Sequence, residues 1–199
     1  MKRNVLVAVR FTLITTLIFG LGYPLLVTLL SQGIFPNQAN GSLIVRDGKV
    51  VGSRLIAQAF TGDQYFHPRP SAAGSGYDPT SSGGSNLAPT NQALVMRVQQ
   101  DVAKLQKENP GTAIPADLAT MSGSGLDPDI SPAAAEFQIP RVAKARAMKT
   151  DDLRRIVARH TQPRQLGLLG EPRVNVLELN LDLDASSADA AIRKRRTAP

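Results

Sequence analysis

The 199-residue sequence contains no cysteine, no tryptophan and only two histidines, His67 and His160. The absence of cysteine excludes a disulfide scaffold, a thiolate zinc site, an iron–sulfur centre and a cysteine nucleophile. Neither histidine has a second histidine at metal-ligand spacing, so the sequence predicts no metal site. The sequence also lacks a Gly-x-Ser-x-Gly elbow and a Ser-x-x-Lys pattern, so no serine nucleophile can be nominated.

Phosphate-binding loops are missing as well. The glycine-rich stretches 82–85 and 122–125 are not followed by the Lys-Ser/Thr of a P-loop, and neither opens a helix after a clear strand. We interpret both as turns. These absences together predict a chain without an active site of its own, with a role in binding or assembly.

The formal net charge is +7, but the excess of positive residues is confined to the two ends of the chain. The whole excess comes from Lys2, Arg3, Arg10, Arg193, Lys194, Arg195 and Arg196. Nucleic-acid binding requires a basic face on a folded domain, so we expect no nucleic-acid partner. The small, polar and basic stretch 185–199 is predicted to be a flexible tail, and its charge favours contact with anionic membrane lipid.

A long apolar run stands near the N-terminus. Residues 11–30 span about 30 Å as a helix, which matches the hydrocarbon core of a bilayer. The run is longer than the apolar region of a signal peptide and lacks a good cleavage site, and a buried core helix of this length would carry charges. Basic residues precede the run and no charge follows until Arg46, so the N-terminus is predicted to be cytoplasmic.

Within the span, small or kink-tolerant residues recur every four positions. They are Thr12, Thr16, Gly20, Pro24 and Thr28. Membrane helices pack through such stripes, which makes these residues candidate contacts with a partner helix. The alternative, that the threonines are merely tolerated in the span, stays open.

The remainder of the chain mixes strand and helix patterns. We predict a hairpin at 42–52 around Asp47-Gly48, a long ordered loop at 59–89, helices at 91–108, 131–148 (interrupted by Pro140) and 150–160, and a strand at 173–184 with a break at 176–177. The fold class is α+β: a single N-terminal transmembrane helix followed by one extracytoplasmic α+β domain. The predicted boundaries are a cytoplasmic segment 1–10, a helix 11–30, a domain 31–184 and a tail 185–199.

Specific motifs follow one another along most of the chain. They include Tyr23-Pro24, residues 38–44, Tyr65-Phe66-His67, residues 69–72, residues 83–87, residues 124–127, Gln138-Ile139-Pro140-Arg141-Val142-Ala143 and Glu178-Leu179-Asn180. In this order they resemble the C-subunit family of the bacterial Kdp potassium-transporting P-type ATPase. The resemblance extends from about residue 23 to residue 184.

The resemblance implies a non-catalytic subunit of a high-affinity, ATP-driven potassium uptake complex in the bacterial inner membrane. The implied partners are a channel-like potassium-translocating subunit, an ATP-hydrolysing subunit and a small membrane subunit. The complex uses ATP, Mg²⁺ and K⁺, and we expect no cofactor on this chain. The family is described as raising the ATP affinity of the hydrolysing subunit, and is therefore also called nucleotide-binding. The predicted topology leaves only residues 1–10 on the ATP side, which favours an indirect effect.

The loop at 65–90 is the predicted contact surface for a partner, because ordered loops on a rigid scaffold carry much of protein binding. Its candidate residues are Tyr65, Phe66, Arg69, Ser85 and Asn86. The alternative is that these residues only close a turn against the domain's own core. A second functional hypothesis is a free-standing, membrane-anchored module that binds a periplasmic ligand.

Overall fold

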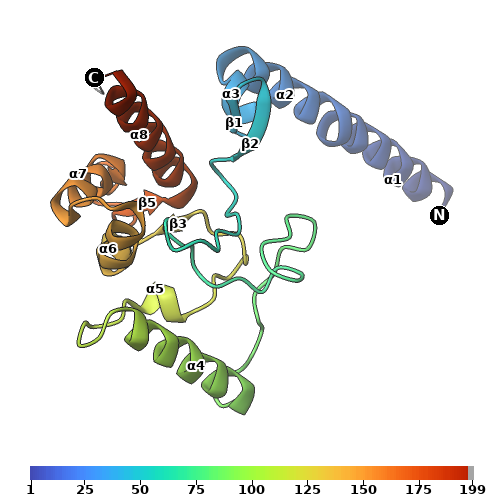
Figure 1. The fold of residues 1–199 in the computed structure, drawn as a ribbon. Helices are drawn as coiled ribbons and strands as arrows, with labels where there is room; N and C mark the ends of the chain where they lie inside the picture. Colours follow the sequence, from blue (N-terminus) through green and yellow to red (C-terminus); the bar gives the residue numbers. More distant parts are fainter. Residues whose placement is uncertain (197–199) are drawn as a thin grey trace. The chain divides into compact units, whose positions relative to one another are not determined.

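The computed structural model describes the backbone of residues 1–196 and the side chains of residues 1–186. The chain forms two compact units, residues 1–53 and the chain from residue 54 onward. We describe each unit by itself (Figure 1).

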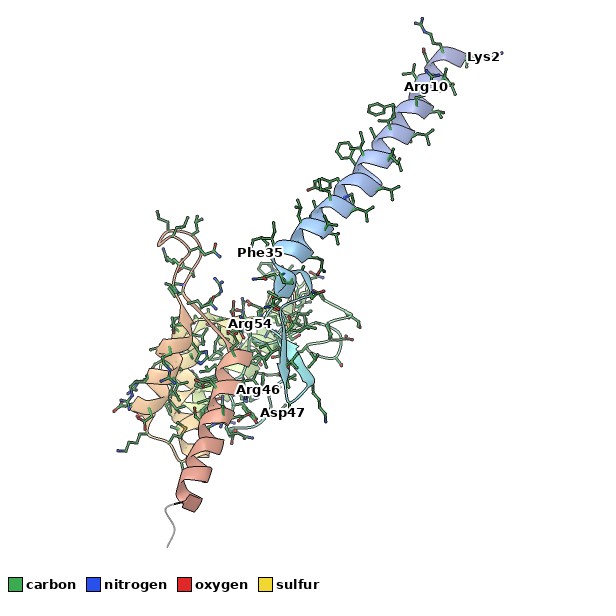
Figure 2. All side chains as sticks on the ribbon, turned by 90° about the horizontal axis from the view of Figure 1, so that it is seen from above. Lys2, Arg10, Phe35, Arg46, Asp47 and Arg54 are labelled. Atoms are coloured by element: carbon green, nitrogen blue, oxygen red, sulfur yellow. The ribbon has the colours of Figure 1, made fainter. Side chains whose placement is uncertain are left out.

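Unit 1 begins with one continuous helix made of α1 (Lys2–Thr15), the π-helical segment η1 (Thr16–Gly22) and α2 (Tyr23–Ile34). It is long and apolar enough to cross a membrane, and none of its residues is buried within the chain. Figure 2 shows its side chains projecting on all sides. The predicted span 11–30 lies inside this helix, and the expected single N-terminal transmembrane helix followed by an α+β domain is confirmed.

The π-helical segment is explained by Pro24. Proline has no N–H and its ring clashes with the carbonyl four residues earlier, which is Gly20. Just before the proline, the backbone hydrogen bonds of the helix change from a spacing of four residues to a spacing of five. The Tyr23 N–H donates to the Ile18 carbonyl, five residues back. The helix therefore continues through the proline.

After the helix, unit 1 contains the single turn α3 (Pro36–Ala39) and the antiparallel strands β1 (Leu43–Arg46) and β2 (Lys49–Ser53). The hairpin predicted at 42–52 is confirmed, and both turn residues, Asp47 and Gly48, have the positive φ that this turn requires. The Asn40 side chain exchanges two hydrogen bonds with Gln32 at 3.1 and 3.3 Å, which ties the start of the hairpin to the end of the helix.

Unit 2 packs helices around a small sheet. Its elements are α4 (Gln92–Glu108), α5 (Ala116–Ala119), β3 (Asp129–Ile130), α6 (Pro132–Arg146), α7 (Thr150–His160), β4 (Thr161–Gln162), β5 (Arg173–Asn175) and α8 (Val176–Arg196). The sheet order is β3-β5-β4, antiparallel throughout. The three helices predicted at 91–108, 131–148 and 150–160 are confirmed as α4, α6 and α7, although α6 runs through Pro140 without the predicted interruption. Asn91 and Ser131 cap the first two helices through their side chains.

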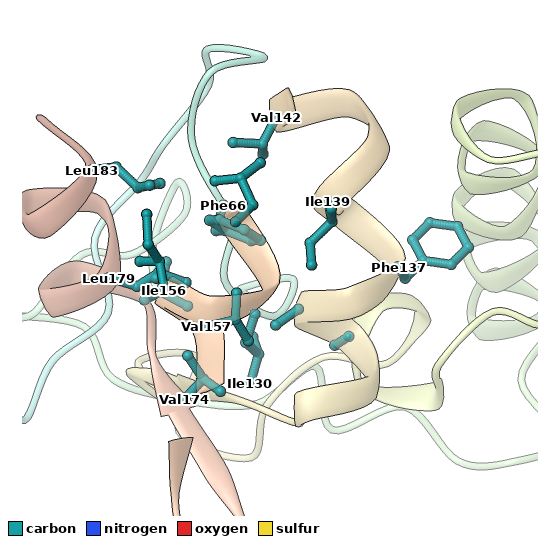
Figure 3. Packing of buried hydrophobic residues seen from close by; sticks show 14 of the residues in the cluster. Phe66, Ile130, Phe137, Ile139, Val142, Ile156, Val157, Val174, Leu179 and Leu183 are labelled. Atoms are coloured by element: carbon teal, nitrogen blue, oxygen red, sulfur yellow. The ribbon is translucent and has the colours of Figure 1, made fainter. Parts of the chain in front are cut away.

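The core of unit 2 lies between α6, α7, α8 and the sheet (Figure 3). Its largest fully buried apolar side chains are Phe66, Ile130, Ile139, Leu153, Leu179 and Leu183. Phe66 is the exception among these, because it comes from the long loop rather than from a helix or strand.

The predicted strand at 173–184 is wrong. Only Arg173–Asn175 form a strand, and the chain then turns into α8 at Val176, where the sequence pattern changes phase. The Asn175 side chain accepts a hydrogen bond from the Glu178 N–H at 3.1 Å, which starts the helix in the manner of an N-cap. The buried residues Val176, Leu179 and Leu183 follow helical spacing. The predicted domain boundary at 184–185 consequently falls inside α8, and the tail's side chains from residue 187 lie outside the described residues.

The loop from residue 54 to residue 91 is ordered by two buried side-chain amides. Asn180 accepts from the Phe66 N–H and donates to the Phe66 carbonyl, both at 2.9 Å. Gln138 does the same for His67, at 2.8 and 3.1 Å. The two amides thus take the place of a neighbouring strand for this stretch of backbone, as buried polar groups require.

Replacing Asn180 with leucine keeps the side-chain size but removes both hydrogen bonds to Phe66. The Phe66 N–H and carbonyl then stay buried without partners, so we expect the free energy of unfolding to fall by about 2–4 kcal/mol. Urea unfolding of the full chain in mild detergent measures this. A control variant, Gln106→Leu on the exposed face of α4, is expected to change stability by less than about 0.5 kcal/mol. Equal stability of the two variants would contradict this role of Asn180.

Candidate functional site

The predicted membrane-helix contacts lie along α1, η1 and α2 and are exposed in this chain. They are Thr12, Thr16, Gly20, Pro24 and Thr28. A four-residue repeat overshoots one turn of an α-helix, so such a stripe drifts around an α-helix. A π-helical turn holds more residues, so the same repeat falls short of a turn there and the drift is opposed between Thr16 and Gly20. The π-helical segment thereby brings this part of the stripe closer to one face.

Tyr65 of the predicted contact loop is fixed by groups from two helices. Its hydroxyl donates to an Asp184 carboxylate oxygen at 3.2 Å, and the Arg146 guanidinium lies 5.2 Å from its ring centre. Arg146 also bonds to the other Asp184 oxygen at 2.8 Å. Partial burial and the Asp184 charge raise the pKa of the Tyr65 hydroxyl. This arrangement holds Tyr65 at the junction of α6 and α8.

Phe66 and Arg69 are turned toward the domain itself. Phe66 is 0% exposed, so its side chain contacts the core and offers nothing to a partner. Arg69 forms an ion pair with Asp127 at 3.1 Å and donates to the Met121 carbonyl at 3.3 Å. For these two residues the placement fits the alternative in which the loop closes against its own domain.

Ser85 and Asn86 stand in a different part of the loop from Tyr65. Ser85 ends the glycine-rich stretch 82–85 and Asn86 follows it. This stretch packs on the second stretch, 122–125, through a hydrogen bond from the Gly83 N–H to the Ser124 carbonyl at 2.8 Å. A Cβ on Gly125 would lie 2.7 Å from the Gly83 oxygen, so only glycine fits this approach. The interpretation of 122–125 as a turn is confirmed by the hydrogen bond from the Gly125 N–H to the Ser122 carbonyl at 3.2 Å, whereas residues 82–85 form no turn of their own. Asn86 is exposed and has a positive φ of 51°.

A cleft of about 420 Å³, which the sequence did not reveal, lies between the loop, α4 and α6. Apolar rings and side chains, among them Phe60, Pro68, Tyr77 and Leu105, form much of its wall. Charged groups of both signs stand around them: Asp63, Asp101, Lys104, Glu108 and Arg141. The cleft therefore combines apolar surface with a mixed-charge lining.

Arg141 organises one side of this cleft. Its Nε donates to Glu108 at 2.7 Å, and its other nitrogens reach the carbonyls of Asp63 and Tyr65 at 2.8 and 2.9 Å and the Gln138 oxygen at 2.7 Å. Arg141 and Gln138 both belong to the motif at residues 138–143 that carries part of the family resemblance. The sequence alone predicts no role for either residue. The available signal was a glutamine and an arginine three residues apart, which places them on the same face of the helix.

His67 also lines the cleft, half-buried between the loop and α6. Its Nε2 lies 3.1 Å from the Gly62 carbonyl, which can only accept, so this nitrogen carries the hydrogen. Burial, followed by the positive charge of Arg141, lowers the pKa of His67. Folding therefore favours the neutral form of this imidazole.

The other histidine, His160, lies in the last turn of α7 and contacts an Asp182 oxygen at 3.0 Å. This hydrogen bond lowers the pKa of Asp182. Among the residues that the structure describes, no three His, Cys, Asp or Glu side chains gather as a potential metal site. The described residues instead present two surfaces that could bind another molecule: an exposed apolar helix and a cleft with a mixed lining.

Comparison with known proteins decides the family. The profile described as "KdpC: K+-transporting ATPase, c chain" matches residues 5–185. The chain belongs to the KdpC family. A "Potassium-transporting ATPase KdpC subunit" of Koribacter versatilis is 59% identical over 186 residues, covering 94% of this chain and 96% of that protein. A protein of the same name from Rhodospirillum rubrum is 61% identical over 174 residues, covering 85% and 89%.

KdpC membership makes the chain a subunit of a potassium-transporting ATPase complex, with other subunits of that complex as its partners. The match includes nearly all of the membrane helix as well as the loop and the cleft. The sequence-based resemblance to this family is thereby confirmed.

A pH-dependent stability follows from the position of His67. In the unfolded chain a histidine titrates near its ordinary pKa of about 6.5, whereas the folded protein resists its protonation. The unfolded state then binds more protons, so the free energy of unfolding falls as the pH drops from about 7 to about 5.5. We expect His67→Gln, which does not titrate but still donates to Gly62, to flatten this slope in urea unfolding. The unmodified chain and Gln106→Leu are the controls, and an unchanged slope contradicts the assignment.

Proposed function

We propose that this chain is a non-catalytic assembly subunit: its helix packs on the channel-like potassium-translocating subunit, and its outer domain covers the potassium entrance. The observation that carries the proposal is the continuous helix of residues 2–34, whose apolar side chains find no partner within the chain's own described residues. A membrane helix exposed on all sides is a surface for lipid or for another subunit. Membership in a multi-subunit family favours the second.

Orientation forms part of the proposal. Lys2, Arg3 and Arg10 precede the apolar run, and this charge pattern favours a cytoplasmic N-terminus with unit 2 on the periplasmic side of the inner membrane. In this topology the outer domain does not meet cytoplasmic ATP. Any influence of the chain on the ATP affinity of the hydrolysing subunit then acts through contacts within the complex, which also holds the small membrane subunit.

The absence of cysteine gives a clean test of this orientation. A single cysteine is introduced at Gln106, which is exposed on α4, or at Lys2 before the span. We expect a membrane-impermeant maleimide to label Gln106→Cys in intact spheroplasts, and Lys2→Cys only after the membrane is permeabilised. The unmodified chain is the blank. The reverse pattern would overturn the proposed topology.

The assembly role is tested by adding bulk to the stripe. Gly20→Leu fills a position where the helix backbone is open to a close neighbour, and we expect the other subunits that co-purify in mild detergent to fall by about tenfold. Potassium-stimulated ATPase activity of the eluate should fall with them. The matched control is Ile18→Phe, which adds bulk about half a turn away from Thr16 and Gly20.

Two outcomes would contradict the assembly role. Normal recovery of the complex from Gly20→Leu removes the stripe as a contact surface. Recovery of the unmodified chain alone, as a stable monomer, points instead to the anchored ligand-binding module. A ligand that raised the melting temperature of that monomer would support the module directly.

A further inference from the structure

A finger-like loop, residues 163–172, joins β4 to β5. The sequence alone predicts no role for this segment. Figure 2 shows this segment as a loop that projects from unit 2. Its two ends are paired in the sheet, with Thr161 opposite Val174 and Gln162 opposite Arg173. Because β5 also pairs with β3 beside the core, the base of the finger is fixed to the most buried part of the unit.

The finger is closed by its own contacts. Pro163 and Pro172 are its first and last residues, and both restrict the backbone where the finger leaves the sheet. Just inside them, an Arg164 Nη2 atom contacts both carboxylate oxygens of Glu171, at 2.7 and 2.6 Å. At the tip, Gln165 and Leu169 exchange backbone hydrogen bonds at 2.9 Å, and the N–H groups of 167 and 168 also find carbonyl partners within the finger.

Three leucines occupy the tip and face outward. Leu166 is 91% exposed, Leu168 is 81% exposed and Leu169 is 60% exposed. Leu166 has a positive φ of 54°, a conformation that costs free energy for a residue with a side chain and persists where the surroundings impose it. A cluster of leucines held out in a fixed shape is a surface prepared for burial against another molecule.

The lack of charge at the tip of the finger indicates that the molecule covering the leucines is a protein rather than lipid. Residues 165–170 carry no charge, and the two charges beside them, Arg164 and Glu171, neutralise each other. The tip also has no aromatic residue. Lipid-binding surfaces draw on cationic side chains for anionic headgroups and on Trp or Tyr at the membrane interface, and the finger has neither. Because most tip N–H groups are bonded internally, the finger can enter an apolar protein pocket without leaving them unpaired.

We propose that the leucine finger, residues 163–172, inserts into an apolar pocket on another subunit of the potassium-transporting ATPase complex, outside the membrane. The inference rests on the proposed assembly function and adds to it a second contact, separate from the membrane helix. The partner surface is defined by its chemistry: it is uncharged, concave and wide enough for Leu166 and Leu168.

Site-specific crosslinking in the assembled complex tests the contact. A photoreactive phenylalanine analogue replaces Leu168 in the full chain, and the matched control places it at Met96, an exposed apolar residue of α4. We expect irradiation to join position 168, and not position 96, to another subunit of the complex, identified by mass spectrometry. Adducts from position 168 with lipid only, with a second copy of this chain only, or with nothing would each overturn the proposal.

A pair of substitutions measures the strength of the contact. Leu166→Ser with Leu168→Ser removes two exposed leucines, and we expect the other subunits to dissociate from the chain at least about tenfold faster after dilution in detergent. Val95→Ser with Met96→Ser is the control, and the melting temperature of each chain verifies that both fold. An unchanged rate in the finger variant contradicts the proposal. If the unmodified chain brings down no other subunit, the assembly function itself fails, so the two failures are distinguishable.

Discussion

Two buried side-chain amides set the path of the longest loop in the protein, and the candidate surfaces depend on that path. Asn180 of α8 and Gln138 of α6 bind the backbone of Phe66 and His67. With Phe66 held in the core, Tyr65 is placed beside Arg146 and Asp184, and His67 lines the cleft. A backbone segment without a strand neighbour would otherwise leave four polar groups unpaired, so these amides convert an irregular loop into part of the core.

Arg141 reinforces the same path at an electrostatic cost. Its side chain and that of Glu108 are mostly buried, and a buried ion pair gains little over an apolar pair because both charges lose water. Arg141 also donates to the carbonyls of Asp63 and Tyr65, which fixes where the loop crosses α6. The pair therefore specifies one arrangement of the loop more than it stabilises the domain. The positive charge beside His67 follows from this, and it helps to keep that imidazole neutral.

Sequence alone predicted the elements whose signals are local. Helix α4 has regular apolar spacing, and α6 begins at the Ser131-Pro132 start signal, so the existence and start of both helices could be predicted. The prediction of a strand at 173–184 was wrong because the leucines from Leu177 to Leu183 alternate as in a strand. Fewer apolar residues in this stretch show the spacing of a helix. The loop contacts and the cleft could not be predicted, because the residues that make them, such as Phe66 and Asn180, stand 114 positions apart.

Two exposed apolar features, the membrane helix and the leucine finger, belong to different units and would act together. The membrane helix lies in unit 1 and the leucine finger in unit 2, and the chain passes directly from one unit to the other at Ser53–Arg54. Once the helix is bound to a partner, the finger is confined near that partner, so its effective concentration is far above that of a free domain. A contact made by only three leucines can then be strong enough to matter. The same reasoning explains how a small, uncharged tip can suffice for binding, because the membrane helix already holds the finger close to its partner.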